Sequence, residues 1–175
     1  MSDVSVRLAT ADDRPVVERL WLMFQHDMSE FGGRLPFPDG SFRRERLEAA
    51  FAGAGWAPYL LTSGDRPAGF AFVRGLDGPT RVVNSFFVVR GARRAGIGAR
   101  AVLEVVARHP GRWEVAFQDA NAGAVRFWRR VAEKVAGESW TEERRPVPNR
   151  PELPPDVWIS FLTRPQHVSP IVGNR

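Results

Sequence analysis

The order of apolar and polar positions at the start of the chain predicts a strand followed by an amphipathic helix. Residues 4–8 alternate between apolar and polar as a half-buried strand does. Thr10 and Asp13 then have the spacing of a capping box, which marks the start of a helix. The apolar residues that follow at helical spacing form its inward face: Val16, Val17, Leu20, Trp21 and Phe24.

The segment 25–41 contains three glycines and two prolines, which interrupt a helix repeatedly. We expect a long loop there, and a second helix over 42–51. Loops of this length without regular structure are usually functional or disordered.

The remaining pattern predicts a sheet with helices between its strands. Apolar runs over 59–62 and 69–73 flank a turn segment and predict a hairpin. The later elements are strands over 82–89 and 113–117, helices over 97–108 and 122–135, and strands over 139–142 and 157–162. The alternation of strand and helix implies parallel pairing through a right-handed crossover. We expect one domain over 1–164 and a flexible C-terminal tail over 165–175.

The composition of the 175 residues restricts the class of protein. With 43% hydrophobic residues, the chain can bury the core of one domain. No apolar run approaches the roughly 20 residues of a membrane span, and the first residues lack the features of a signal peptide. We therefore expect a cytoplasmic protein without a membrane partner. The absence of cysteine excludes disulfides and thiolate nucleophiles, and the three histidines lack ligand-like spacing, so no metal is expected.

Charge is distributed unevenly along the chain. Residues 1–80 hold nine Arg and eleven acidic residues, whereas residues 81–175 hold sixteen basic and nine acidic residues. This favours an anionic ligand on the second half and a cationic one facing the first. A compositional bias, 24 Arg beside a single Lys, explains the same charge without a ligand. The arginines are scattered among acids rather than gathered in a stripe, so we expect no nucleic acid.

A glycine-containing segment between the strand over 82–89 and the helix over 97–108 carries the clearest chemical signal. Glycines let backbone amides approach a phosphate, and the helix start adds unpaired N–H groups and a positive dipole end. Cationic side chains stand nearby in the sequence: Arg90, Arg93, Arg94 and Arg100. A diphosphate is the natural ligand of such a segment.

Two alternatives stand beside that interpretation. Gly96, Gly98 and Ala101 also fit a dinucleotide fingerprint, with Asp119 about 20 residues further along. However, in that fold the first glycine follows the strand almost at once, whereas residues 90–95 intervene here, and the 56 residues after Asp119 are too few for the rest of a doubly wound sheet. The second alternative is an ordinary turn that contains glycine. A Walker loop is excluded because the chain has no Gly-Lys-Ser/Thr.

Two motifs make the chain resemble the GNAT superfamily of acyl-CoA-dependent N-acetyltransferases. The pattern Arg/Gln-x-x-Gly-x-Gly/Ala is matched from Arg93 to Gly98, after an apolar strand. The pattern Asn-x-x-Ala-x-x-Phe/Leu-aromatic is matched from Asn121 to Trp128. The order of predicted elements also fits, over about residues 4–162. The resemblance implies a single α/β domain with a mixed central sheet of about seven strands, about four flanking helices and a splayed parallel pair in the middle.

The resemblance further implies that acetyl-CoA binds as the acyl donor. Its diphosphate would lie on the backbone amides of 94–99, and its pantetheine arm would enter between the strands 82–89 and 113–117. The implied contacts are Val88, Val89, Arg93, Arg94, Ala95, Gly96, Ile97, Gly98, Ala99, Asn121 and Phe127.

The catalytic positions depart from the family pattern. An amine with a pKa near 10.4 is well under about 1% unprotonated at neutral pH, so a base is useful. Some members place a Glu at the position of Ala116 and a Tyr acid at that of Trp128. Trp128 could donate a hydrogen bond to the leaving sulfur or only pack. Further catalytic candidates are Glu30 and Gln118, with Glu114 as another residue able to hold a deprotonating water.

The acceptor candidates lie in the predicted loop over 25–41. Acids and aromatics can hold an ammonium group, and here they are His26, Asp27, Glu30 and Phe31. The alternative is a solvated loop with a hydrophobic anchor.

The expected function is an N-acetyltransferase that moves the acetyl group of acetyl-CoA to a primary amine of a small molecule, by direct attack in a ternary complex. The alternative is a GNAT-like acyl-CoA-binding module with little or no catalysis. The apolar strand over 157–162, interpreted as exposed, would allow a homodimer.

Overall fold

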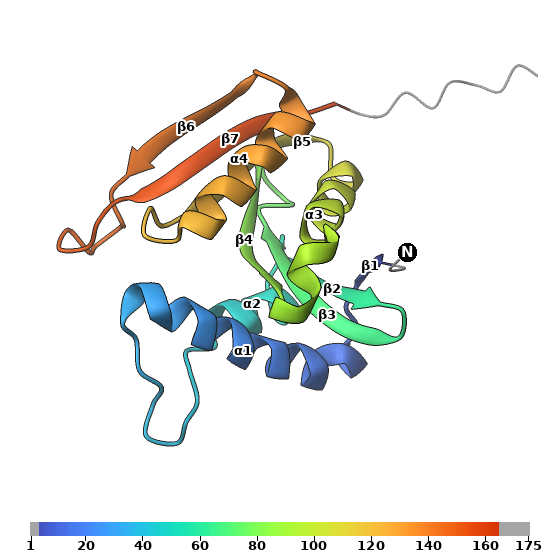
Figure 1. The fold of residues 1–175 in the computed structure, drawn as a ribbon, viewed down its shortest axis with the longest axis vertical. Coiled ribbons are helices and arrows are strands. Elements are labelled where there is room, and N and C mark those ends of the chain that lie inside the picture. The colour runs from blue at the N-terminus through green and yellow to red at the C-terminus, as the bar shows by residue number, and fades with distance from the viewer. Residues whose placement is uncertain (1–3, 165–175) are drawn as a thin grey trace, which may run out of the picture.

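The computed structural model describes residues 4–164. Within them lies a seven-stranded mixed sheet in the order β1-β2-β3-β4-β5-β7-β6 (Figure 1). The strands are β1 (Val4–Leu8), β2 (Ala57–Ser63), β3 (Arg66–Arg74), β4 (Thr80–Val88), β5 (Gly111–Phe117), β6 (Trp140–Arg145) and β7 (Asp156–Thr163). The helices are α1 (Arg14–Gly32), α2 (Glu45–Ala52), α3 (Ile97–Arg108) and α4 (Ala122–Ala136), with short 3-10 helices η1 (Ala11–Asp13) and η2 (Arg90–Ala95). This confirms the predicted α/β fold; the predicted tail over 165–175 lies outside the described residues.

Helices cover both faces of the sheet. On one face, α1 and α2 bury Leu20, Trp21 and Leu47 against aromatic residues of β3 such as Phe70. On the other face, α3 and α4 pack on a larger core that includes Trp113 of β5. Burial of these side chains is the dominant favourable contribution to folding, and it fixes the orientation of each helix relative to the strands.

The parallel pair β4 and β5 is splayed. The two strands pair from Thr80 opposite Arg112 to Val83 opposite Val115, and the pairing ends there although β4 continues to Val88. A β-bulge lies at the same level, because the register between β3 and β4 shifts around Asn84. Bulges bend a strand and increase its local twist. Beyond Asn84, therefore, β4 retains β3 as a partner and a gap opens toward β5.

Helix α1 is longer than the sequence pattern predicted. The expected loop over 25–41 was wrong in its first part, because α1 continues to Gly32 and ends on Gly33, whose φ is 61°. The N–H of Gly33 donates to the carbonyl of Ser29 at 2.9 Å, and a glycine in the left-handed region is a common helix end. The acceptor candidates at 26, 27, 30 and 31 are consequently residues of a helix, held on a rigid element rather than on a loop.

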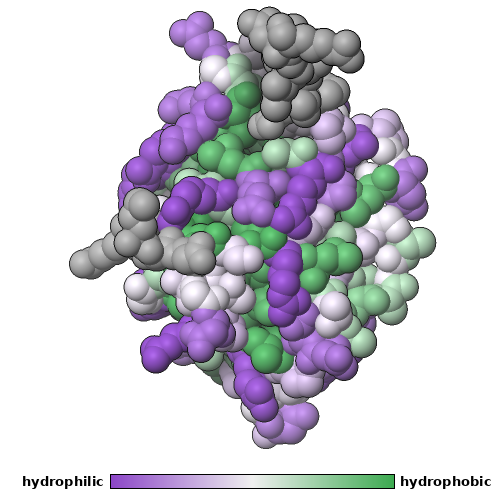
Figure 2. Space-filling model, turned by 90° about the vertical axis from the view of Figure 1, so that its right-hand side faces the viewer, coloured by the Kyte–Doolittle hydropathy of each residue, from purple (hydrophilic) through white to green (hydrophobic). Residues whose placement is uncertain are grey.

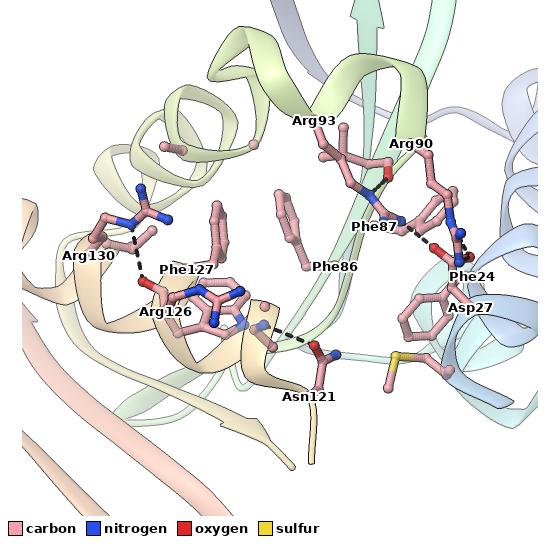
Figure 3. Close-up of a pocket in the computed structure, with 18 of the residues that line it drawn as sticks. Phe24, Asp27, Phe86, Phe87, Arg90, Arg93, Asn121, Arg126, Phe127 and Arg130 are labelled. Carbon is pink, nitrogen blue, oxygen red and sulfur yellow. Dashed lines mark hydrogen bonds and ion pairs between the residues drawn. The ribbon is translucent and has the colours of Figure 1, made fainter. Parts of the chain in front are cut away.

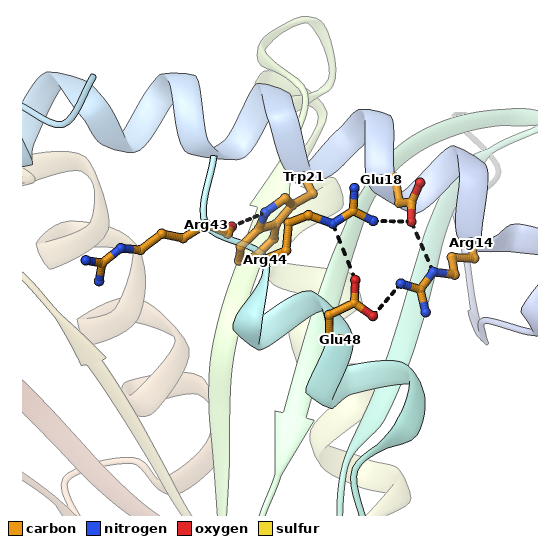
Figure 4. A network of polar contacts seen from close by, with 6 residues as sticks. All are labelled: Arg14, Glu18, Trp21, Arg43, Arg44 and Glu48. Atoms are coloured by element: carbon orange, nitrogen blue, oxygen red, sulfur yellow. Dashed lines mark hydrogen bonds and ion pairs between the residues drawn. The ribbon is translucent and has the colours of Figure 1, made fainter. Parts of the chain in front are cut away.

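An ionic network fixes α2 against α1 (Figure 4). Arg44 donates to Glu18 at 2.6 Å and to Glu48 at 3.3 Å, and Arg14 contacts the same two carboxylates at 3.0 and 2.5 Å. The indole N–H of Trp21 donates to the carbonyl of Arg43 at 2.9 Å. The chain that connects the two helices is therefore anchored where it enters α2.

The apolar strand over 157–162 is not exposed, contrary to the sequence interpretation. β7 pairs with β5 on one side and with β6 on the other. Val157, Ile159 and Phe161 are buried, and Leu162 is the strand's exposed large apolar residue, at 59%. On this side the edge of the sheet is instead β6, which is mostly charged, as protected edges often are. The reason for expecting a homodimer through 157–162 is lost.

The face of the molecule shown in Figure 2 mixes hydrophilic and apolar side chains, as the surfaces of globular proteins usually do. Over residues 4–164, no helix combines the length and the apolar character needed to cross a membrane.

Candidate functional site

A cavity of about 650 Å³ lies where β4 leaves β5 (Figure 3). Its walls are α1, the end of β4, η2, the start of α3, and α4. From α1 and β4 the lining residues are Phe24, Asp27, Met28, Glu30, Phe31, Phe86, Phe87 and Val88. From η2 and α3 they are Arg90, Arg93, Gly96, Gly98 and Ala99. From α4 and the residue before it they are Asn121, Gly123, Ala124, Arg126, Phe127, Trp128, Arg130, Val131 and Lys134.

The backbone of β4 offers polar groups to the gap. The N–H of Val89 donates to Ala68 on the β3 side at 2.8 Å. Because successive residues of a strand direct their N–H and C=O groups to opposite sides, those of Val88 are directed to the gap. The Val88 carbonyl accepts a hydrogen bond from Arg93 Nε at 2.8 Å. The Val89 carbonyl, in turn, accepts from Ala92 at 2.9 Å. Of the two backbone positions expected from the sequence, Val88 thus faces the gap, whereas Val89 is bonded within the protein.

The start of α3 faces the same cavity. Gly96 precedes the helix with a φ of 70°, a conformation that favours glycine. The first N–H groups of a helix lack an acceptor within the helix and carry its positive dipole end, and Gly98 and Ala99 of this first turn line the cavity. The Ile97 side chain is buried in the core, so only its backbone can serve a ligand. The side chains of Arg94 and Ala95 lie outside the described part of the chain, and their contacts remain predictions.

Gly98 leaves room for a pair of aromatic rings. A Cβ at position 98 would lie 3.2 Å from Phe127 Cε2 and 3.6 Å from Phe86 Cε1. The two rings stack, with centroids 5.5 Å apart and an interplanar angle of 12°. Asn121 caps α4 by accepting the N–H of Ala124 at 3.0 Å. The motif residues Gly98, Asn121 and Phe127 are therefore brought together, as the sequence suggested.

Asp27 joins α1 to η2. Its carboxylate accepts from Arg90 Nη2 at 2.9 Å and Nε at 3.1 Å, and from Arg93 Nη2. The side chain is 16% exposed. Burial raises the pKa of this carboxyl, but hydrogen bonds and attraction from Arg93 and Arg90 outweigh it, so the pKa of Asp27 lies below its ordinary value. Asp27 is thus engaged by two guanidinium groups instead of being available to an ammonium, and both guanidinium groups are directed toward α1 (Figure 3).

The other acceptor candidates divide into two groups. Glu30 and Phe31 line the cavity, with Glu30 exposed at its edge. His26 is exposed and does not contribute to the lining. Glu30 and Phe31 therefore line the same cavity as the motif residues, whereas His26 lies outside it.

The catalytic candidates also differ in their surroundings. Trp128 lines the cavity but is only 6% exposed, and its ring packs edge-on against Phe86 and Phe127, at centroid distances of 5.6 and 4.9 Å. Gln118 follows β5 outside the lining, and its carbonyl accepts the N–H of Asn121 at 3.0 Å.

Glu114 is bound within the protein. It alternates along β5 with core residues that face α3 and α4, so its side chain lies on the opposite face of the sheet. Its carboxylate accepts two hydrogen bonds from Arg145, at 3.0 and 3.1 Å, and one from Ser160 at 3.1 Å. The Arg145 hydrogen bonds, with that of Ser160, lower the pKa of Glu114 despite partial burial. A carboxylate satisfied in this way is a poor proton acceptor.

Several lining residues were not predicted from the sequence. They include Phe24 and Met28 of α1 and a basic group on α4, Arg126, Arg130 and Lys134. The four-residue spacing of that group was visible in the sequence. Across residues 4–164, no group of three or more His, Asp or Glu side chains is arranged to hold a metal ion.

Comparison with known proteins identifies the family. The family model described as "Acetyltransferase (GNAT) family" matches residues 18–132. No curated protein sequence matches the chain.

Solved structures share the fold at low identity. An acetyltransferase from Thermus thermophilus is 16% identical, with a TM-score of 0.64, over 93% of this chain and 99% of the other. A structure from Corynebacterium glutamicum, described as "histone acetyltransferase HPA2 and related acetyltransferase", is 15% identical, with a TM-score of 0.65. The match covers 96% of this chain and 100% of the other. AAC(6')-Ib, solved with paromomycin and acetyl-CoA, is 16% identical, with a TM-score of 0.59, over 91% and 93%. With two of its motifs meeting at one cavity in this fold, the chain belongs to the GNAT family of acetyltransferases.

Proposed function

We propose that the protein transfers the acetyl group of acetyl-CoA to a primary amine of a small molecule, by direct attack of the amine in a ternary complex. One observation carries this proposal: the gap beyond Asn84 opens into a cavity that also contains the start of α3 and an acidic edge of α1. A donor and an acceptor can therefore reach one point from two sides.

The cavity fits the parts of acetyl-CoA. The diphosphate would be held by the first N–H groups of α3, where Gly98 leaves the backbone accessible. The amide-containing arm would bond the backbone of β4 at Val88, where β4 no longer pairs with β5, because an extended ligand can pair with a strand edge. When bound, acetyl-CoA supplies an acetyl group activated as a thioester. A structural neighbour solved with acetyl-CoA supports this donor.

The acceptor side is assigned to the end of α1. Glu30 and Phe31 offer a carboxylate and an aromatic ring at the cavity edge, which together suit an ammonium group. A small acceptor is favoured by Ala116, which stands where some members carry a Glu, and by the neighbour solved with paromomycin.

Glu30 is the candidate for proton transfer that the Glu30→Gln variant below tests, since Glu114 is engaged by Arg145 and Ser160. A positioned base contributes roughly 10² to 10⁴-fold to such a reaction. Gln118 could only orient a water molecule, because an amide does not accept a proton near neutral pH. Trp128 contributes packing: its indole N–H is a donor of hydrogen bonds but not an acid for a leaving thiolate.

A second candidate function is binding of acyl-CoA without turnover. It is favoured by the replacement of the usual acid and base by Trp128 and Ala116. Calorimetric titration with acetyl-CoA and a turnover assay with a panel of amines separate the two functions. The chain has no cysteine, so a thiol reagent reports only the CoA that is released. Binding with amine-dependent thiol release supports the transferase, binding without release supports the second function, and absence of binding contradicts both.

The acceptor assignment predicts the behaviour of Glu30→Gln. We expect its KM for a cationic amine to rise with little change in acetyl-CoA affinity, because only attraction to the acceptor is removed. If Glu30 is also the base, kcat falls and its increase with pH disappears. His26→Gln is the matched control, one turn earlier on α1 and outside the lining. Unchanged kinetics of Glu30→Gln with every accepted amine would place the acceptor elsewhere.

A further inference from the structure

The α4 wall of the cavity carries a row of three basic side chains, Arg126, Arg130 and Lys134, here called the basic row. They recur every fourth residue and therefore lie along one face of the helix. All three line the cavity. At a rise of about 1.5 Å per residue, the row extends roughly 12 Å along α4.

The basic row has no acidic partner within the part of the chain that the structure describes, since none of the ion pairs there includes its members. Arg130 Nε donates only to the carbonyl of Arg126, at 3.3 Å. The adjacent Arg129 differs, because it forms a two-point ion pair with Glu142 at 2.7 and 2.8 Å. The positive charge of the row is therefore open to a ligand, whereas that of Arg129 is satisfied within the protein.

The row and the start of α3 line different walls of one cavity. Figure 3 shows the stacked rings of Phe86 and Phe127 between Arg126 on α4 and Arg93 on η2. The cavity thus offers two positively charged regions: the N–H groups at Gly98 and Ala99, and the basic row. A ligand that fits this arrangement carries two separate phosphate groups, a diphosphate for the first region and another phosphate for the second.

We propose that the basic row binds the 3′-phosphate on the ribose of the acyl donor, and so makes the site select the phosphorylated CoA over its dephosphorylated form. This inference rests on the proposed function. A phosphomonoester carries about −1.5 to −2 charges at neutral pH, and guanidinium groups bind phosphate with geometry suited to two hydrogen bonds. Three cations with no acidic partner among residues 4–164 match that charge.

The test compares two ligands, acetyl-CoA and 3′-dephospho-acetyl-CoA, by calorimetric titration. The wild-type protein should bind acetyl-CoA on the order of tenfold or more tightly than the dephospho form. In Arg126→Gln/Arg130→Gln, affinity for acetyl-CoA should fall to that of the dephospho form, while affinity for the dephospho form is unchanged. Arg129→Gln is the matched control, with the same charge removed from the same helix, and should keep the preference.

Three results would overturn the inference and leave the proposed function standing. Equal wild-type affinity for both ligands would do so, and this comparison needs no variant to fold. Equal weakening of both ligands in the double variant would mean that the row acts on the diphosphate or on general charge. A third result is a raised KM of the double variant for an anionic acceptor, in a protein that shows no preference for acetyl-CoA over its dephospho form. It would mean that the basic row binds the acceptor and not the donor. If the wild-type protein binds neither ligand, both the inference and the proposed function fail. Failure of the inference alone is thus distinguished from failure of the proposed function.

Discussion

Two groups of arginines border the cavity, and they differ in what balances their charge. Arg90 and Arg93 on η2 are held by Asp27 of α1, and Arg93 also donates to the Val88 carbonyl. Arg126 and Arg130 on α4 have no carboxylate partner over residues 4–164. Both groups contribute equally to a count of charges along the sequence. Only the second retains its full capacity to attract an anion, because an internal ion pair has already satisfied the first.

The largest effect is expected from a substitution that fills the space between the start of α3 and α4. In Gly98→Val, the added Cβ would press on Phe127 at 3.2 Å, and the branched side chain would cover the first turn of α3. We expect acetyl-CoA affinity to fall by about 100-fold, which corresponds to about 3 kcal/mol. Calorimetric titration measures the loss, and circular dichroism checks the fold.

Gly91→Val is the matched control, since a Cβ at position 91 meets nothing within 4 Å. It should retain most of the affinity. If Gly98→Val binds as tightly as Gly91→Val, the donor does not approach the start of α3.

Removing the balancing charge on the α1 wall should destabilise the fold. In Asp27→Asn, Arg90 and Arg93 lose their carboxylate, but they are 69% and 45% exposed, so solvent screens much of the loss. We expect the free energy of unfolding at pH 7 to fall by about 1–2 kcal/mol, measured by urea denaturation. The exposed Asp12→Asn serves as the control for loss of one negative charge.

The same variant has a predicted pH dependence. The pKa of Asp27 is lower in the folded chain than its ordinary value, so its contribution is fully present above the unfolded pKa, near 3.9, and is lost as the pH falls through the folded pKa. The stability difference between wild type and Asp27→Asn should be constant between about pH 5 and 7 and shrink below about pH 4. A difference independent of pH down to pH 2 would contradict the ion-pair explanation.

Giving the α4 wall its own carboxylate would sharpen the comparison. In Gly123→Glu, the new side chain lies three residues before Arg126 in the first turn of α4, where a Cβ would contact only Asn121 Oδ1 at 3.5 Å. We expect the free energy of unfolding to rise by about 0.5–1 kcal/mol, because glycine is unfavourable in helices and an acid suits the N-terminal turn.

The affinity of Gly123→Glu for acetyl-CoA should fall by about three- to fivefold, because the new carboxylate neutralises part of the basic row. Gly123→Gln should show the part of the stability gain that comes from removing glycine, with affinity retained; equal affinities of the two variants would argue against the charge effect.

The smallest effect is expected on the opposite face of the sheet. Glu114 already accepts hydrogen bonds from Arg145 and Ser160, so Glu114→Gln should leave the pH profile of kcat in place and kcat within about twofold, unlike loss of a base. Initial rates between pH 6 and 9 measure this. Disappearance of the rising limb would identify Glu114 as the base after all.

Local features of the fold could be predicted from the sequence. The glycines at 96 and 98 and the apolar strand before them act within one turn of the chain, so the start of α3 follows from residue types alone, whereas the 3-10 helix η2 was not predicted. The sequence analysis placed the end of α1 incorrectly, because the glycines and prolines that predicted a loop from residue 25 all lie at or after Gly32, and nothing before Gly32 breaks the helix. At Asp27, within that part of α1, the helix is also fixed from outside. That position meets arginines 63 and 66 residues away, a contact that no local pattern contains.

The rest of the site depends on long-range packing. The position of β7 between β5 and β6 is a choice of strand partners, and an apolar run does not specify it. The spacing of Arg126, Arg130 and Lys134 is visible in the sequence, but which way they face is set by the rotation of α4, whose Trp128 and Val131 are buried against the sheet.

The ion pair between Asp27 and η2 connects the proposed acceptor side of the cavity to the proposed donor side. Asp27 is part of α1, next to the proposed acceptor residues Glu30 and Phe31, and its two arginines immediately precede the start of α3. If an amine bound there displaced α1, it would strain this ion pair and so alter the free energy of η2. By thermodynamic reciprocity, whatever factor the amine applies to the Kd of acetyl-CoA, acetyl-CoA applies to the Kd of the amine.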